Sequence, residues 1–182
     1  MPLPARLSLK LLRRFRRHRR GSAAVEFALI APLFFALLFA IIEVGMIFFA
    51  SQVLETVTQD SARMIMTGQA QSASYTQAQF KSYVCGRIGA LFDCTNGIYV
   101  DVRSYSSSTG FANVNVASPI DSSNCFLPSM QYSPGGASDI VVVRLFYQWP
   151  LFVTKLGFNP SNLCNGKRLL TATAAFKNEP FN

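Results

Sequence analysis

Residues 19–42 read RRGSAAVEFALIAPLFFALLFAII, and this stretch decides the fold of the chain. Two arginines precede Gly21, a single carboxylate follows at Glu26, and an apolar run then covers residues 27–42. A charged side chain costs roughly 2.5–3.5 kcal/mol at the centre of a bilayer and less toward its edge, so a carboxylate at this threshold needs a specific role. We therefore predict that the apolar run enters a membrane and that residues 1–20 stay on the cytoplasmic side.

The net charge of +8 is concentrated before Gly21. Eight basic residues lie there with no acid among them, and the other nine of the 17 basic residues are balanced by all nine acidic ones. The eight are Arg6, Lys10, Arg13, Arg14, Arg16, Arg17, Arg19 and Arg20. Arginines next to a span hold that end in the cytoplasm and attract anionic lipids. A nucleic-acid patch is the alternative, but the apolar run follows too closely for that, and we predict no nucleic-acid partner.

The apolar stretch, counted over residues 27–50, corresponds to about 36 Å of helix, which exceeds a hydrocarbon core of ~30 Å. Pro32 removes a backbone donor and is expected to kink the helix or loosen one turn, whereas Gly45 allows another backbone to approach closely. Glu43 is a second carboxylate. It lies about 25 Å from Glu26 and about 100° around the helix, so the two acids do not face one partner.

Two other interpretations fit this stretch less well. A cleaved secretory signal peptide fits poorly, because its apolar core is usually ~7–15 residues long and no acid opens it. An unprocessed single-pass anchor fits the length, but it gives Glu26 no role.

The segment GSAAVEF at residues 21–27 resembles the processing site of a type IV prepilin, and of the type IVb branch in particular. The longer run AVEFALIAP (24–32), with Glu43, SQVL (51–54) and SAR (61–63), resembles the TadE-like family of minor pseudopilins from bacterial tight-adherence (Flp) pilus systems. The final FKNEPF (176–181) is similar to the ends of TadE- and TadG-like chains. The close resemblance covers residues 20–66 and the last dozen.

This resemblance implies a processing site formed by Gly21, Ser22, Glu26 and Phe27. A prepilin peptidase would cut after Gly21, and Ser22 would become the new N-terminus. Glu26 would support processing or assembly by facing the N-terminal amine of a neighbouring subunit, since a buried carboxylate is tolerated when it pairs with a cation. Pro32, Glu43 and Gly45 would contribute to packing within the membrane.

The implied partners are the prepilin peptidase, other pilins and pseudopilins, the Tad assembly platform proteins and membrane lipids. The implied location is the bacterial inner membrane, with a single pass, a cytoplasmic N-terminus and an extracytoplasmic head. Incorporation into a pilus stays open at this point.

Beyond the span, helical spacing continues along an apolar stripe that ends near Gly68. The stripe comprises Leu54, Val57, Ser61, Met64 and Ile65. A second helix is predicted to begin at Thr76, which forms a capping box with Gln79. Its buried stripe would comprise Phe80, Val84, Ile88 and Leu91.

Strands are predicted at residues 98–105, 140–149 and 169–176, the second of which is the most apolar and therefore central. A further short strand is expected near 114–116, and a helical turn within 150–158. The predicted fold class is therefore α+β: a long N-terminal transmembrane helix that continues into a small pilin-like head with a 3–4-stranded antiparallel sheet. The expected regions are a basic leader (1–21), the transmembrane and extended helix (22–68) and the extracytoplasmic head (69–182).

All four cysteines lie beyond the span: Cys85, Cys94, Cys125 and Cys164. An even number in an oxidising compartment predicts two disulfides, with three connectivities possible. A Cys85–Cys94 bridge is doubtful if the second helix runs unbroken to residue 92, since about 13 Å would then separate the two residues. Zinc is disfavoured because there is no Cys-x-x-Cys pair, and the single histidine, His18, precedes the span.

The function predicted from these features is structural and non-enzymatic: a minor pseudopilin in pilus biogenesis, adhesion or secretion. The alternative is an unprocessed, membrane-anchored binding module or TadG-like envelope protein. An envelope enzyme is disfavoured, because the head lacks histidine and carries no Gly-x-Ser-x-Gly motif or phosphate-binding glycine loop. No metal, cofactor or catalytic residue is predicted.

Overall fold

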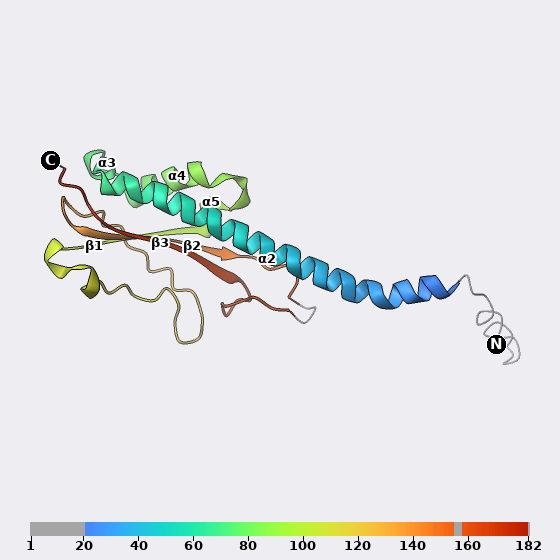
Figure 1. Cartoon of the computed structure of the whole chain (residues 1–182). Coiled ribbons are helices and arrows are strands. Elements are labelled where there is room, and N and C mark those ends of the chain that lie inside the picture. Colours follow the sequence, from blue (N-terminus) through green and yellow to red (C-terminus); the bar gives the residue numbers. More distant parts are fainter. Residues whose placement is uncertain (1–20, 155–157, 182) are drawn as a thin grey trace, which may run out of the picture. The chain divides into compact units, whose positions relative to one another are not determined.

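The computed structural model describes residues 21–154 and 158–181 (Figure 1). The predicted basic leader and His18 lie outside these residues. The chain divides into two units, Met1–Ile42 and Glu43–Asn182. One long helix, α2 (Ser22–Met66), contributes its first part to one unit and its second part to the other.

In the described part of the first unit, α2 presents its apolar side chains outward. Phe27, Leu29, Leu33 and Phe34 are all more than half exposed. Helix α2 continues through Pro32 without a break. By length and composition, this is a helix that can cross a membrane.

The second unit is an α+β head, which confirms the predicted fold class. Its further helices are α3 (Gln69–Ser72), α4 (Gln77–Ile88) and α5 (Cys94–Gly97), with short 3₁₀ turns at Gly89–Leu91, Ser107–Thr109 and Phe111–Asn113. Its strands are β1 (Ile98–Tyr105), β2 (Ile140–Trp149) and β3 (Arg168–Lys177). The described strands form one antiparallel sheet in the order β1-β2-β3, so the predicted central strand is in the centre.

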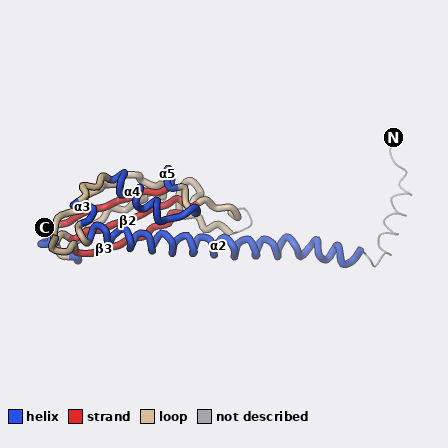
Figure 2. Tube along the Cα trace, turned by 90° about the horizontal axis from the view of Figure 1, so that it is seen from above, coloured by secondary structure: helices blue, strands red, loops and turns tan. Residues whose placement is uncertain are grey.

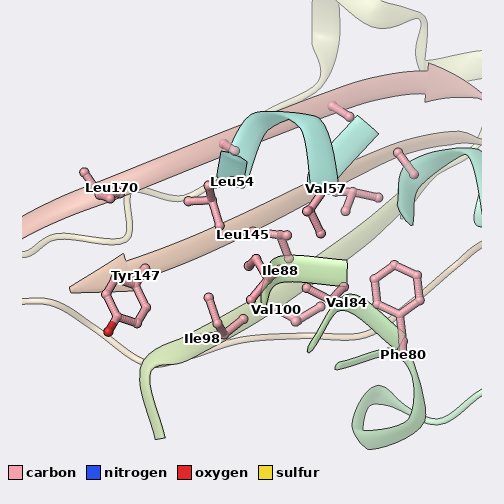
Figure 3. Packing of buried hydrophobic residues seen from close by; sticks show 14 of the residues in the cluster. Leu54, Val57, Phe80, Val84, Ile88, Ile98, Val100, Leu145, Tyr147 and Leu170 are labelled. Carbon is pink, nitrogen blue, oxygen red and sulfur yellow. The ribbon is translucent and has the colours of Figure 1, made fainter. Parts of the chain in front are cut away.

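The main core lies between the sheet and the helices α2 and α4, which run alongside the strands (Figure 1, Figure 2). The predicted stripe of α2 is buried throughout, and Leu54, Ser61 and Ile65 have no exposed surface. Phe80, Val84 and Ile88 of α4 pack against Ile98, Val100 and Leu145 of the sheet (Figure 3). Because side chains alternate along a strand, every second residue of each strand points toward the two helices.

The opposite face of the sheet carries a smaller apolar cluster. Phe146, Leu163 and Leu169 are buried there, and Tyr99 and Phe126 pack against them. Loops between β1 and β2 and between β2 and β3 supply the cover for this cluster, whereas Thr171, Thr173 and Ala175 of β3 are exposed.

The ends of the two main helices follow the predicted signals. Thr76 caps α4 in a capping box with Gln79. Gly68, in the left-handed region at φ 78°, lies two residues beyond the end of α2 at Met66, and the ring of Phe181 packs where a Cβ at Gly68 would stand. The Glu179 N–H also donates to the Met66 carbonyl oxygen at 2.9 Å. The last residues of the chain are therefore fastened to the end of α2.

The prediction that Leu91 is buried is wrong, because its side chain is 38% exposed. Helix α4 ends at Ile88, and Gly89 adopts φ 68°, a conformation that glycine tolerates and other residues rarely adopt. The chain changes direction there, so Leu91 does not extend the helical stripe.

The same bend explains the disulfide that an unbroken helix would have prevented. Cys85 and Cys94 are bridged, with 5.6 Å between their Cα atoms, and Cys125 is bridged to Cys164 across 39 residues. The objection to Cys85–Cys94 assumed an unbroken helix to residue 92, and that assumption is wrong. Two disulfides among four cysteines confirm the predicted number.

The expected strand at residues 114–116 is absent from the described structure. The free edge of β1 is taken instead by residues 131–133: the Val102 N–H donates to Gln131, and the Ser133 N–H donates to Val102. The expected helical turn in 150–158 is also absent among its described residues. Backbone N–H groups in this loop donate to the Glu43 side chain of α2.

Candidate functional site

The four residues of the predicted processing site lie at the start of α2. The helix begins at Ser22, immediately after Gly21. A Cβ at Gly21 would meet no atom within 4 Å, so the backbone there is open. Glu26 is exposed, and Phe27 is 67% exposed. Glu26 and Phe27 are therefore accessible on the helix, and cleavage after Gly21 stays a prediction.

Glu43 occupies a very different environment on the same helix. Its side chain is only 3% exposed, although it lies within an apolar stretch. Its Oε1 accepts a hydrogen bond from the Phe152 N–H at 2.6 Å, and its Oε2 accepts one from the Val153 N–H at 2.9 Å. Both carboxylate oxygens are thus used by consecutive backbone amides.

The loop that meets Glu43 follows directly from β2. The strand ends at Trp149, and Pro150 has no N–H with which to continue a ladder. Leu151 packs against the main core, whereas Phe152 points outward and is 73% exposed. The loop therefore joins the end of the central strand to α2 while one aromatic side chain projects from the head.

Sequence reasoning identified Glu43 but not its partner. The carboxylate and the two amides are 109 and 110 residues apart, and backbone donors leave no trace in residue type. The sequence carried one signal for this loop: Pro150 ends the most apolar strand, and the aromatic Phe152 follows it. Gly45, two residues beyond Glu43, has open space where a Cβ would stand, so its predicted close approach to another backbone stays a prediction.

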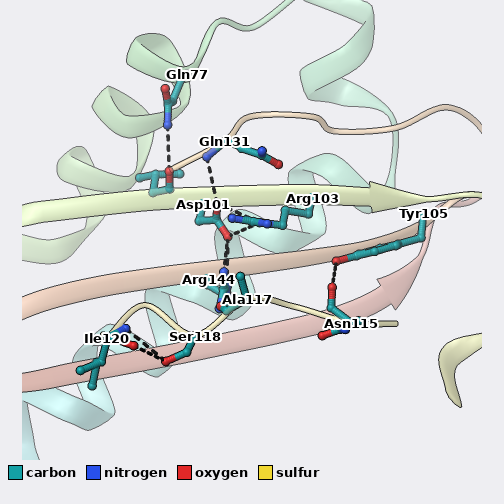
Figure 4. A network of polar contacts seen from close by, with 11 residues as sticks. Gln77, Asp101, Arg103, Tyr105, Asn115, Ala117, Ser118, Ile120, Gln131 and Arg144 are labelled. Carbon is teal, nitrogen blue, oxygen red and sulfur yellow. Dashed lines mark hydrogen bonds and ion pairs between the residues drawn. The ribbon is translucent and has the colours of Figure 1, made fainter. Parts of the chain in front are cut away.

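A second polar centre lies on the face of the sheet that the loops cover (Figure 4). Asp101 has no exposed surface, and its cross-strand partner is Arg144. Arg144 Nη2 contacts Asp101 Oδ2 at 2.6 Å, and Arg103 Nε contacts the same oxygen at 3.0 Å. The Gln131 N–H donates to Oδ1 at 2.9 Å, and Arg144 Nη1 donates to the Ala117 carbonyl oxygen at 2.8 Å. The network fastens two loop segments to the sheet.

The charge balance of this network is visible in one pKa. Burial on its own raises the pKa of the Asp101 carboxyl, but hydrogen bonds from Arg103, from the Gln131 backbone and from Arg144 outweigh it. The pKa therefore lies below its usual value, and Asp101 is a buried anion with two cationic partners. Such a group holds structure together.

No group of three or more histidine, cysteine, aspartate or glutamate side chains that could hold a metal is found among residues 21–154 and 158–181. The four cysteines are consumed by the two disulfides. Two described features could serve function: the outward apolar helix and the contact between Glu43 and the 150–154 loop.

Fold and site together define an α+β protein with one N-terminal helix that is long and apolar enough to cross a membrane. Residues 21–63 match the family model described as TadE-like protein. This match confirms the resemblance over that segment and relates it to the Tad pilus family of proteins. Comparisons with curated proteins and with solved structures give no match. The matched segment covers most of α2 and ends before the rest of the head begins.

Proposed function

We propose that this chain is a minor pseudopilin of a Tad/Flp (type IVb) pilus assembly system. The observation that carries the proposal is the TadE-like match, which begins at Gly21 and covers the helix with the outward apolar side chains. The protein would act structurally, without catalysis, in pilus biogenesis, adhesion or secretion.

In this proposal the basic leader stays on the cytoplasmic side of the bacterial inner membrane, and the head lies on the extracytoplasmic side. A prepilin peptidase cuts after Gly21, so that Ser22 carries a new amine at the start of an apolar helix. The outward side chains of residues 23–42 then pack against lipid or against the helices of other pilins. Glu26 faces the amine of a neighbouring subunit, because a carboxylate in an apolar bundle needs a cationic partner.

The direct test is the intact mass and N-terminal sequence of the protein purified from cells with and without an active prepilin peptidase. We expect a mature chain that begins at Ser22 only when the peptidase is active. Gly21→Val should block the cut. Gly45→Ala is the matched control, since a Cβ at Gly45 also meets open space on the same helix. A full-length chain in cells with an active peptidase would refute the proposed processing.

The second candidate is an unprocessed, membrane-anchored binding module or TadG-like envelope protein. It is favoured by one observation: the head has its own core and two disulfides, while the family match stops at residue 63. Two results together would establish it in place of the first proposal. They are an uncut chain in cells with active peptidase, and a ligand that binds the head of the full-length protein.

A further inference from the structure

The contact with Glu43 fixes the position of the loop at residues 150–154 along the axis of α2. The Phe152 and Val153 amides donate to the Glu43 carboxylate at 2.6 and 2.9 Å, so their backbone lies within one glutamate side chain of the helix. Any environment that surrounds α2 at Glu43 therefore also surrounds this loop.

That environment is apolar, because the apolar surface of α2 continues past Glu43 into the head. Val44, Met46, Phe48 and Phe49 are 48%, 40%, 67% and 61% exposed. Phe49 lies about 9 Å beyond Glu43 at 1.5 Å per residue. A bilayer that covers these side chains extends beyond the level of Glu43, and so beyond the level of the loop.

Irregular backbone at membrane depth requires internal partners for its polar groups, because no water is present to supply them. Pro150 has no N–H to satisfy. The N–H groups of Phe152 and Val153 are satisfied together by the two oxygens of Glu43, in a charge-assisted pair of hydrogen bonds. The loop thus gives the buried carboxylate its hydrogen-bond partners, and the carboxylate satisfies the amides of a loop that carries an exposed aromatic side chain.

Phe152 is the most exposed large apolar side chain in the described part of the second unit. We propose that residues 150–154 form a second membrane contact, in which Phe152 enters the outer acyl region of the bilayer beside α2 and Glu43 holds the loop there. The ligand is lipid. The proposal rests on α2 crossing a membrane, and it is independent of cleavage at Gly21 and of pilus assembly. Its consequence is that the head touches the bilayer at two points and has a fixed tilt.

The test uses the full-length protein in phosphatidylcholine vesicles at a low protein-to-lipid ratio. Phe152→Trp is compared with Phe111→Trp, and the signal of the native Trp149 is subtracted from both. Phe111 is a matched control: it is 55% exposed and follows the end of β1 that pairs with the start of β2, whereas the loop follows the other end of β2. We expect lipids brominated on their acyl chains to quench the added tryptophan at position 152 at least threefold more than that at 111. Equal quenching at the two positions would overturn the proposal.

A second copy of the chain is the other occupant that could cover Phe152. In that case the emission of the tryptophan added in Phe152→Trp would change with the protein-to-lipid ratio and would not respond to lipid bromination. This result would also overturn the proposal.

The role of Glu43 is tested in the Phe152→Trp background. Glu43→Ala removes both acceptors and should lower bromolipid quenching to the Phe111→Trp level. Glu43→Gln keeps one acceptor oxygen and should give an intermediate value. Unchanged quenching in Glu43→Ala would refute the part assigned to Glu43. If that variant does not fold, the comparison of positions 152 and 111 with native Glu43 still decides whether the loop meets lipid.

Discussion

The two units of this chain handle apolar surface in opposite ways. In the first, α2 points phenylalanines and leucines outward, and the described residues supply no core of their own. In the second, the same helix turns its apolar stripe onto a sheet, and even the charged Asp101 and Glu43 are satisfied from within. The two parts of α2 are therefore suited to two different environments. The first part relies on a membrane or on other helices for cover, whereas the sheet covers the apolar stripe of the second part.

The largest effect that sharpens this comparison is expected at the buried charge of the head. Asp101→Asn leaves Arg144 and Arg103 without their anion, and breaking a buried ion pair costs about 3–5 kcal/mol of unfolding free energy. Denaturant unfolding of the detergent-solubilised protein, followed by Trp149 fluorescence, measures this loss. The control is Asp60→Asn, which removes an exposed pair with Arg87 and should cost about 1 kcal/mol or less. Similar losses in the two variants would contradict the buried network.

The same carboxyl predicts a pH dependence. The folded pKa of Asp101 is lowered, so its stabilisation is fully present above the unfolded pKa of about 3.9 and is lost as the pH falls toward the folded pKa. Unfolding free energies measured from pH 6 down to pH 3 should fall more steeply in the native protein than in Asp101→Asn. Parallel curves would show that Asp101 does not contribute in this range.

The next effect compares leucines from the two units. Leu54 has no exposed surface, and Leu54→Ala should cost the head about 2–5 kcal/mol through lost burial and a cavity. Leu33 is 67% exposed in the first unit, and Leu33→Ala should leave the unfolding free energy of the head within about 0.5 kcal/mol of its original value. A large loss in Leu33→Ala would break the comparison, because it would make the first unit part of the head's stability.

The smallest effect concerns a local signal within the head. Thr76→Ala removes the side chain that accepts from the Gln79 N–H, and losing such a cap costs about 0.5–2 kcal/mol. Thr56 on the exposed side of α2 only donates to the Gln52 carbonyl oxygen, so Thr56→Ala is the control and should change stability little. Urea unfolding of both variants distinguishes the loss of the cap from the general effect of replacing a threonine with alanine.

The elements that the sequence predicted correctly are those set by neighbouring residues. Alternation located β1 at residues 98–105, the cap at Thr76 located the start of α4, and helical spacing found the buried stripe around Leu54. The family resemblance likewise came from one continuous segment.

The misses have a common physical cause, because each depends on a partner far along the chain or on a single backbone angle. Gly89 at φ 68° ends α4 early and brings Cys85 to Cys94. Residues 131–133 take the edge of β1, and this leaves 114–116 without a strand to join. The amides that meet Glu43 come from a loop that no local pattern connects to it.

The two disulfides have a practical consequence. They engage every cysteine of the chain, and the cytosol keeps such thiols reduced. The oxidation state of the cysteines therefore reports the compartment of the head. Cysteines that resist alkylation indicate a head that reached an oxidising compartment, whereas four reactive thiols indicate a head that stayed in the cytosol. A maleimide mass shift can therefore read topology from the native polypeptide, without fusing any reporter to it.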